Sequence, residues 1–221
     1  MKNNELQIWI PAQGASQRIP NKNFKPFYKD ESLLEIAVKK LVKIVEKENI
    51  FVSSDSIKAK KICKNLGINF IQRTNSLLGN KIKQKDLFNH FFDNTPKSKY
   101  VAWVQVTDPL FERFQEFLSY KPKKDEVYSV ATEYKKHAFF KGYPVNFNFG
   151  DWHPVTQEIE PIIIPRWSVF LGRRATFLNF KYHFGKYNKF FICNEEFIDI
   201  DYEEDFLLAQ KSYEKKISRE D

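Results

Sequence analysis

Short apolar runs alternate with longer amphipathic segments through the first half of the chain. The apolar runs have the length of buried strands and lie at residues 6–10, 50–53, 68–71 and 100–106. The amphipathic segments repeat apolar residues at helical spacing and lie at residues 33–45, 57–66 and 85–93. Because strands that alternate with helices build a parallel sheet with covered faces, the pattern predicts an α/β fold with a mostly parallel sheet flanked by helices.

Capping residues mark the ends of the first two predicted helices. Ser32 and Glu35 have the spacing of a capping box, in which a hydroxyl and a carboxylate satisfy free backbone N–H groups at a helix start. Asp55 and Ser56 are placed to cap the second helix, and Gly67 follows its last turn. These residues set the expected boundaries of both helices.

The rhythm changes after residue 120. Strand-like segments follow one another closely, at residues 126–134, 143–150, 160–172 and 190–193. Prolines within residues 142–165 predict edge strands or a small β-rich arm that projects from the main sheet. No internal repeat or low-complexity segment interrupts the chain, so we expect a single domain over residues 1–221.

The chain closes with the acidic run "FIDIDYEED" and a helix predicted at residues 203–217. Asp199 and Asp201 alternate along an extended segment, so both carboxylates can point to one side. Such a pair offers the hard oxygen ligands that Mg²⁺ prefers. Asp201 and Glu204 also have capping-box spacing, and a helix cap beside a turn acid is the alternative interpretation.

Composition narrows the class of protein. The chain has 221 residues and is 42% hydrophobic, which is enough to bury a sizeable core. Its net charge of +8 favours anionic partners, but the lysines are scattered and no nucleic-acid-binding motif is present, so we expect no nucleic acid partner. Cys63 and Cys193 lie far apart, which suits a reducing cytoplasm. No run approaches the roughly 18 apolar residues of a membrane span, so we expect a cytoplasmic protein without membrane contact.

A loop rich in small and basic residues follows the first predicted strand. Ligands usually bind at the carboxyl ends of strands in open α/β sheets. Gly14 and Ser16 are small enough to let backbone N–H groups approach an anion, while Arg18 and Lys22 supply positive charge. The loop lacks the P-loop and dinucleotide patterns. A phosphate group is the expected ligand, and an ordinary polar loop is the alternative.

Six short motifs then follow one another in a familiar order. They are "IPAQGASQRIPNKNFKPF", "FVSSDS", "QRTNSLLGNKIKQKDLFNH", "VQVTDPLF", "VYSVATEYKKHAF" and "IDIDYEEDFLLAQ". In this order, over nearly the whole chain, the sequence resembles the cytidylyltransferases that activate acidic sugars, the CMP-sialic acid and CMP-Kdo synthetase group. The resemblance implies a Rossmann-like nucleotide-diphospho-sugar transferase fold with a dimerisation arm, and a homodimer.

The resemblance also implies a reaction and its residues. CMP would pass from CTP to a small anionic acceptor, an acidic sugar, with Mg²⁺ as cofactor and pyrophosphate as the other product. The implied nucleotide-binding residues are Ala12, Gln13, Gly14, Ser16, Lys22, Asn23 and Arg73. Lys22, Arg18 and Asp201 would be catalytic, Asp199 and Asp201 would hold the metal, and Gln105, Lys141 and Arg166 would bind the acceptor.

Several positions depart from the family pattern. Gln13 and Gln17 stand where the family usually carries Arg and Lys, which removes two positive charges beside the phosphates. Asp108 replaces a small Ser. Two alternatives follow: the enzyme acts on a different acceptor, such as a phosphorylated small molecule, or the protein is a catalytically weakened nucleotide-binding relative.

Overall fold

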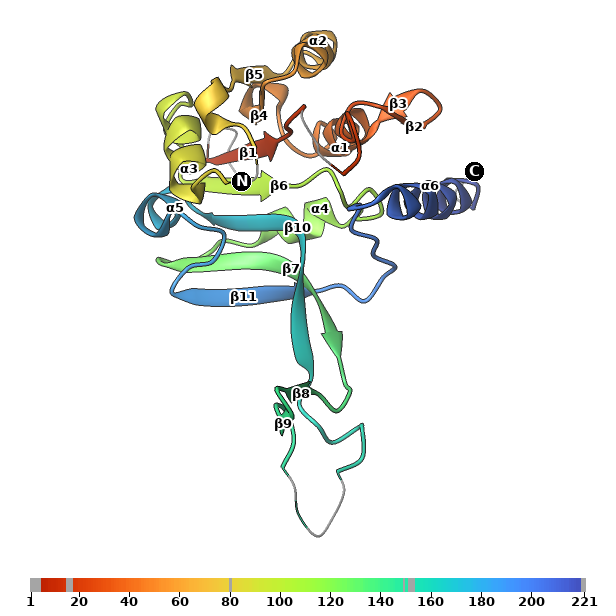
Figure 1. The fold of residues 1–221 in the computed structure, drawn as a ribbon. Helices are drawn as coiled ribbons and strands as arrows, with labels where there is room; N and C mark the ends of the chain where they lie inside the picture. Colours follow the sequence, from red (N-terminus) through yellow and green to blue (C-terminus); the bar gives the residue numbers. More distant parts are fainter. Residues whose placement is uncertain (1–4, 15–17, 80, 149, 151–153, 220–221) are drawn as a thin grey trace.

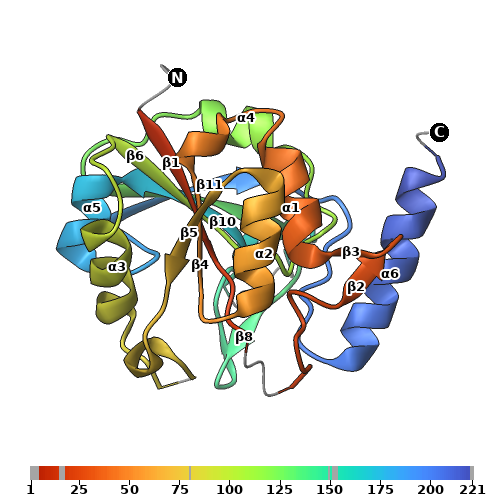
Figure 2. The ribbon, with the colours of Figure 1, turned by 90° about the horizontal axis from the view of Figure 1, so that it is seen from above.

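Seven strands of the described part of the chain form one sheet, and helices cover both of its faces (Figure 1, Figure 2). The structure is a computed structural model that describes residues 5–14, 18–79, 81–148, 150 and 154–219. In spatial order the sheet is β11-β7-β10-β6-β1-β4-β5. Its strands are β1 (Leu6–Pro11), β4 (Ile50–Ser54), β5 (Asn69–Gln72), β6 (Tyr100–Val104), β7 (Glu126–Tyr134), β10 (Ile162–Arg173) and β11 (Tyr187–Ile192).

The helices and short elements complete the α/β/α layers that the sequence predicts. The helices are α1 (Leu33–Leu41), α2 (Ile57–Leu66), α3 (Gln84–Asp93), α4 (Phe114–Ser119), α5 (Arg174–Phe180) and α6 (Glu203–Ile217). Two hairpins pair β2 (Pro26–Tyr28) with β3 (Glu31–Ser32) and β8 (Phe139–Phe140) with β9 (Tyr143–Pro144). Single 3-10 turns lie at η1 (Lys47–Asn49) and η2 (Asn75–Leu77). No helix in the described residues is long and apolar enough to cross a membrane.

Local capping explains where the helices begin and end. The predicted capping box is confirmed, because the Ser32 side chain accepts from the backbone N–H of Glu35 and the Glu35 carboxylate accepts from the Ser32 N–H at 2.9 Å. Ser56 caps α2, and Gly67 ends it at φ 69°. The first helix ends at Leu41 rather than at residue 45, and beyond it the N–H groups of Ile44 and Val45 both donate to the Leu41 carbonyl.

Alternate residues of the central strands face two separate hydrophobic clusters, since successive side chains of a strand point to opposite sides. Ile8 and Ile10 of β1 pack with residues of α1, α2 and α6. Trp9, between them, packs with residues of α3 and α5. Ala102 and Trp103 of β6 divide between the two clusters in the same way. The sheet is therefore buried on both faces.

The order of the strands creates a switch point beside β1. This strand pairs in parallel with β4 on one side and with β6 on the other. After β1 the chain forms β4 and β5 on one side of β1 and then crosses to form β6 on the other side. The connections therefore run in opposite directions from β1. Because β1, β4, β5 and β6 are parallel, their carboxyl ends meet at one edge, which is where open α/β sheets bind ligands.

The segment between β7 and β10 projects from the sheet as an arm (Figure 1). β10 is antiparallel to both of its neighbours, and its register with β7 shifts between Pro165 and Phe170. A bulge of this kind bends a strand, and beyond it β7 and β10 continue to pair toward the β8–β9 hairpin. Of the predicted strand at residues 143–150, the described part that is extended in a ladder is Tyr143–Pro144.

Aromatic side chains fill the space between the sheet and α3. Trp9 stacks on Phe91 with ring centroids 4.4 Å apart and meets Trp103 at 4.3 Å. His183, in the loop after α5, lies 4.0 Å from the ring centroid of Trp103 and is only 3% exposed. Neither of its ring nitrogens has a hydrogen-bond partner among the described residues. Burial lowers the pKa of His183 to about 4, so the imidazole is neutral at pH 7.

This buried imidazole predicts a loss of stability in mild acid. The pKa of His183 is lowered in the folded state. Between about pH 6.5 and pH 4 this histidine therefore binds a proton in the unfolded chain but not in the folded protein. Stability therefore falls as the pH falls, by about 2 kcal/mol between pH 7 and pH 5. Urea titrations of the wild type and of His183→Phe should show that the variant lacks this part of the decline. Parallel pH profiles for the two proteins would contradict it.

Candidate active site

A pocket of about 200 Å³ opens at the carboxyl edge of the sheet, beside the switch point. Its lining comes from the loop after β1 and from the ends of β5 and β6, and consists of Pro11, Gln13, Lys22, Asn23, Arg73, Leu87, Trp103, Gln105, Val106 and Thr107. A larger hollow of about 530 Å³ lies beside Arg174 at the amino edge of β6. There Arg174 donates to the backbone carbonyls of Phe92 and Pro96, so its guanidinium serves the fold.

Arg73 forms a buried positive wall of the pocket. It is 5% exposed, and its Nε donates to the Ser53 hydroxyl at 2.9 Å. Burial lowers the pKa of Arg73 to about 10, partly opposed by the charge of Asp55, so the side chain remains protonated at pH 7. Its Nη2 has no partner among the described residues, which leaves a charged donor for a ligand.

Two further buried polar atoms around the pocket have no partner within the described part of the chain. They are Oδ1 of Asn23 and Nε1 of Trp103. Asn23 is held in place because its Nδ2 donates to the backbone carbonyl of Gln13 at 3.1 Å. A buried polar atom without a hydrogen bond costs free energy, so three such atoms around one pocket indicate a polar ligand.

Lys22 and Arg18 bring positive charge to the acidic segment that precedes α6. The Arg18 Nη2 lies 2.8 Å from Oδ1 of Asp201, and the Lys22 Nζ lies 3.9 Å from the same oxygen. Lys22 also donates to the backbone carbonyl of Ile200, 178 positions later in the chain. Burial lowers the pKa of Lys22, and the nearby Asp201 carboxylate opposes this shift.

Asp199 and Asp201 lie close enough for their charges to interact, as the sequence pattern predicts. Burial raises the pKa of Asp199, a hydrogen bond with the Thr107 side chain lowers it, and the charge of Asp201 raises it again. Among the described residues no group of three or more His, Cys, Asp or Glu side chains is arranged to hold a metal. Two carboxylates are nevertheless the number that Mg²⁺ commonly uses, because it keeps several waters, so the donor set fits this ion.

The N-cap residue of α6 is Tyr202, and the carboxylate that caps this helix start is that of Asp205, which corrects the sequence-based alternative for Asp201. The Asp205 carboxylate accepts from the backbone N–H groups of Asp201 and Tyr202 at 3.0 and 2.7 Å. The Asp201 carboxylate instead faces Arg18 and Lys22. Capping by Asp205 therefore leaves the Asp201 side chain available to a ligand.

The opening loop uses its small residues differently from the sequence-based expectation. The backbone N–H of Gly14 donates to Oδ1 of Asp55 at 2.7 Å, so this N–H already has an anionic partner. A Cβ on Gly14 would lie 3.3 Å from side-chain atoms of Asp55 and Ser56, so a larger residue would require these side chains to shift slightly. Ala12 is fully buried, with its N–H bonded to the Ser53 carbonyl. Ser16 lies outside the described residues.

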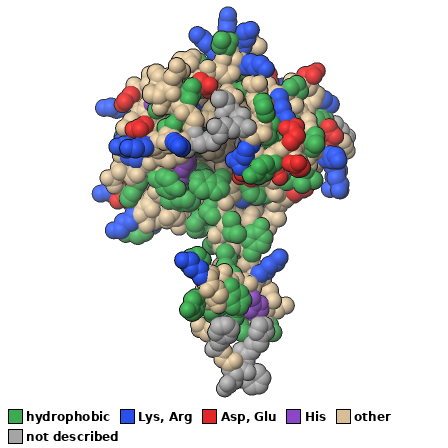
Figure 3. Space-filling view, viewed as in Figure 1, with side chains coloured by type: hydrophobic (Ala, Val, Ile, Leu, Met, Phe, Trp, Pro, Cys, Tyr) green, Lys and Arg blue, Asp and Glu red, His purple; other side chains and the backbone are tan. Residues whose placement is uncertain are grey.

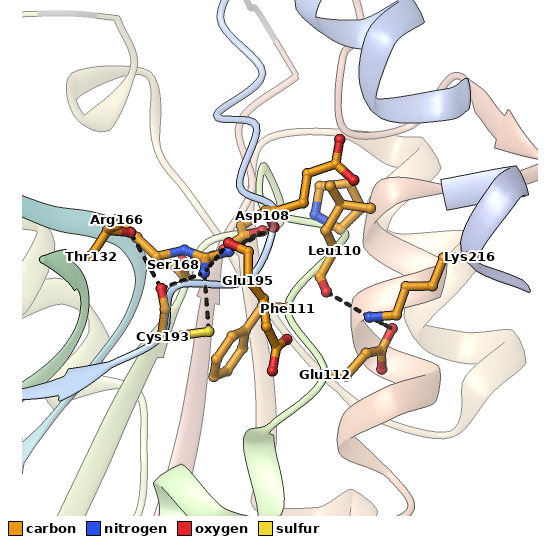
Figure 4. Close-up of polar contacts among 12 residues, drawn as sticks. Asp108, Leu110, Phe111, Glu112, Thr132, Arg166, Ser168, Cys193, Glu195 and Lys216 are labelled. Atoms are coloured by element: carbon orange, nitrogen blue, oxygen red, sulfur yellow. Dashed lines mark hydrogen bonds and ion pairs between the residues drawn. The ribbon is translucent and has the colours of Figure 1, made fainter. Parts of the chain in front are cut away.

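The three residues expected to bind an acceptor end in three different places. Gln105 lines the pocket, fixed by a bond from its backbone N–H to the Ser168 carbonyl at 2.8 Å. Lys141 lies in the turn of the β8–β9 hairpin on the arm and is exposed. Arg166 is 2% exposed and forms an ion pair of 3.1 Å with Asp108 (Figure 4). In this structure the Arg166 guanidinium therefore bonds within the protein and does not line the pocket.

The structure adds residues to the site that sequence reasoning had passed over. Thr107 holds Asp199, Asp55 holds Gly14, and Trp103 lines the pocket. Asp55 and Thr107 each follow the carboxyl end of a strand, a position that could have signalled them. Trp103 has the sequence pattern of a core residue in a buried strand. Nothing in the sequence indicates that Trp103 lines a pocket while Trp9 does not.

Charge over the rest of the surface is mixed. In Figure 3 basic and acidic side chains are interspersed over the body of the protein on the face shown, without a single basic stripe. The arrangement that indicates a ligand is thus the pocket itself. Two residues of its lining, Lys22 and Thr107, contact the Asp201 and Asp199 carboxylates, and buried polar atoms around it lack partners among the described residues. Such a pocket can hold a polyanion with a polar ring attached.

Comparisons with known proteins identify the family. A family model described as "Cytidylyltransferase" matches residues 8–145. Over 215 residues, 90% of this chain, the sequence is 26% identical to an N-acylneuraminate cytidylyltransferase of Streptococcus agalactiae serotype III (strain NEM316), of which the match covers 51%. The chain thus spans about half the length of the curated relatives it matches.

Two solved structures have a similar fold. One is a CMP:2-keto-3-deoxy-manno-octonic acid synthetase complexed with CTP, with a TM-score of 0.67 at 10% identity over 96% of this chain and 99% of the other. The other is a 4-diphosphocytidyl-2C-methyl-D-erythritol synthase from Anaerococcus prevotii DSM 20548, with the same TM-score at 14% identity over 96% and 97% of the two chains. At these identities the likeness concerns the fold alone.

The assignment of the helix cap gives a direct prediction. Asp205→Ala should lower the free energy of unfolding by about 1 kcal/mol, because two N–H groups at the start of α6 lose their acceptor. Asp201→Asn should change it by less than about 0.5 kcal/mol, since its partner Arg18 is half exposed. Urea denaturation of both variants provides the comparison, and a larger loss in Asp201→Asn would return the capping role to Asp201.

Proposed function

The chain belongs to the cytidylyltransferase family, whose model matches residues 8–145, and on that premise we propose that it transfers CMP from CTP to an acidic sugar. In this reaction a sugar hydroxyl oxygen forms a bond to the α-phosphorus of CTP while the bond to pyrophosphate breaks. The observation that carries the proposal is the pocket lined by Arg73 and Lys22, because Lys22 also contacts the Asp199–Asp201 segment.

The nucleotide is proposed to lie along the pocket from Arg73 to Lys22. Arg73 and Asn23 each have a buried polar atom without a hydrogen-bond partner in the described ranges, which suits the hydrogen-bonding groups of a base and a ribose. Lys22 lines the pocket and would place a point charge beside the leaving pyrophosphate. Positioning and charge stabilisation are the main demands of such a transfer, and the residues present supply both.

Asp199 and Asp201 are proposed to hold Mg²⁺. When bound, the ion would neutralise charge on the triphosphate. The chain's own residues prepare for it: Thr107 orients Asp199 through a hydrogen bond, and Asp205 frees Asp201 by capping α6. Arg18 provides a further cation at this end of the pocket.

The acceptor is proposed to bind beside Gln105, where aromatic rings border the pocket. The His183 ring lies between Trp103, which lines the pocket, and Trp167, at centroid distances of 4.0 and 5.4 Å. Trp167 is 40% exposed and adopts φ 57°, a conformation that bulky residues rarely occupy and that often accompanies function. Such rings suit the apolar face of a sugar.

Turnover assays test the function directly. Pyrophosphate release should require CTP and Mg²⁺, with ATP, GTP and UTP inactive, when each is offered with a panel of acidic sugars and phosphorylated small molecules. Lys22→Met should reduce kcat by roughly tenfold to a hundredfold, because it removes one charge-assisted bond to the leaving group.

Lys25→Met is the matched control, since Lys25 pairs with Glu203 at 2.7 Å and does not line the pocket. Its kcat should stay within about threefold of the wild type. Turnover with a phosphorylated acceptor alone would change the substrate class. Binding of CTP without turnover on any acceptor would instead identify a weakened relative, for which Gln13 is the motivating residue.

The arm is proposed to form a homodimer. Its exposed apolar side chains include Phe139, Phe140, Tyr143 and Val145, each more than half exposed. Apolar side chains gathered on a projecting segment favour a second surface that covers them. In such a dimer Lys141 would approach the acceptor pocket of the second copy rather than that of its own chain.

Light scattering measures this assembly. The wild type should have twice the 26.4 kDa mass of one chain at micromolar concentration, and the double variant Phe140→Glu/Tyr143→Lys should shift toward the single-chain mass. Ile57→Glu, on α2 of the body and 74% exposed, is the control and should leave the mass unchanged. A 26.4 kDa wild type would reject the dimer.

A further inference from the structure

Asp108 and Arg166 form an ion pair in the interior of the protein, outside the pocket. Their side chains are 2% and 1% exposed, and Nη2 of Arg166 lies 3.1 Å from Oδ2 of Asp108. The Ser168 hydroxyl donates to the same oxygen. Asp108 follows the end of β6 and Arg166 lies at the bulge of β10, so the pair joins two strands where their regular pairing ends.

Arg166 also holds the segment that leads to the metal-binding carboxylates. Its Nη1 donates to the carbonyls of Cys193 and Glu195 at 3.2 and 3.4 Å, and its Nη2 donates to the carbonyl of Glu196 at 3.3 Å (Figure 4). The guanidinium lies 4.5 Å from the centroid of the Phe197 ring. Residues 193–202 belong to no helix or strand, so these side-chain bonds replace a regular backbone ladder.

The segment is fastened again a few residues later, next to Asp108. The backbone N–H of Ile200 donates to the Thr107 carbonyl at 3.3 Å, and the Thr107 side chain bonds to the Asp199 carboxylate. Asp108 is the next residue after Thr107. The ion pair therefore lies between two attachment points of residues 193–201 and connects both to the sheet.

We propose that the Arg166–Asp108 pair is a positioning device that sets the place of the Asp199 and Asp201 carboxylates, and through them the affinity for Mg²⁺. This inference rests on the proposed metal role of the two carboxylates. A planar guanidinium suits the task, because its fixed fork of donors reaches a carboxylate and several carbonyls at once. A buried ion pair is often no more stabilising than apolar side chains of similar size, so stability alone does not account for it.

The test separates positioning from general stability. Asp108→Leu/Arg166→Met removes both charges together and leaves no unpaired charge in the interior. Arg166→Lys keeps the charge but loses the fork. Lys216→Met is the control. Lys216 donates to the Leu110 carbonyl and pairs with Glu112, and it makes no hydrogen bond or ion pair with the described residues 193–201.

Manganese serves as the probe for the metal site, with free Mn²⁺ measured by electron paramagnetic resonance in the presence of CTP. Changes to groups that orient metal ligands typically cost tenfold to a hundredfold in affinity, and we expect a loss of this size in both Arg166 variants. CTP binding in EDTA should stay within about twofold of the wild type. In both Arg166 variants, measured without ligand, the backbone amides of residues 194–201 should exchange hydrogen at least tenfold faster than in the wild type.

Unchanged Mn²⁺ affinity together with unchanged exchange would overturn the proposal. A wild type that fails to bind CTP would sink the proposed function instead, while the exchange experiment would still decide whether Arg166 orders the segment. Should the double variant fail to fold, Ser168→Ala removes one hydrogen bond to Asp108 and should weaken Mn²⁺ binding by a few fold. A Ser168→Ala protein with wild-type affinity and exchange would count against positioning.

Discussion

Two carboxylates, Asp199 and Asp201, lie together at the carboxyl edge of the sheet, and this like-charge pair requires cations and hydrogen-bond donors beside it. Like charges in a partly buried place are unfavourable unless cations or hydrogen-bond donors offset them. Here Arg18, Lys22 and Thr107 provide that offset. The cations come from the loop after β1 and the hydroxyl from the end of β6. The carboxylates are therefore tolerated only when both strands and the segment before α6 have come together.

The stability of the protein resides elsewhere, in the two hydrophobic clusters on the faces of the sheet. Burial of apolar side chains is the dominant favourable contribution to folding. This gain offsets the cost of polar atoms of Arg73, Asn23 and Trp103 at the edge of the sheet that have no partner among the residues described. Many enzymes have the same separation: packing and hydrogen bonding are satisfied through most of the fold, and unsatisfied groups are found at the functional site.

Most of the fold could be predicted from the sequence because its signals are local. The apolar periodicity and the caps at Ser32, Ser56 and Gly67 depend on residues within a few positions of one another. The sequence pattern does not predict α4 and α5, because helices of one or two turns are too short to show a helical repeat of apolar residues. Their register depends on packing partners distant in the chain, such as Tyr128 under Phe117, with stacked rings 4.9 Å apart.

The sequence by itself determined which chemistry the site contains: basic residues after the first strand, an arginine after the third, and alternating carboxylates near the end. Only the tertiary structure decided how each side chain is used. It assigned the cap to Asp205 and freed Asp201, and it buried Arg166 against Asp108. The physical reason is that burial and partners are set by segments far apart in the chain, as when Lys22 reaches the carbonyl of Ile200, whereas sequence patterns report only on neighbours.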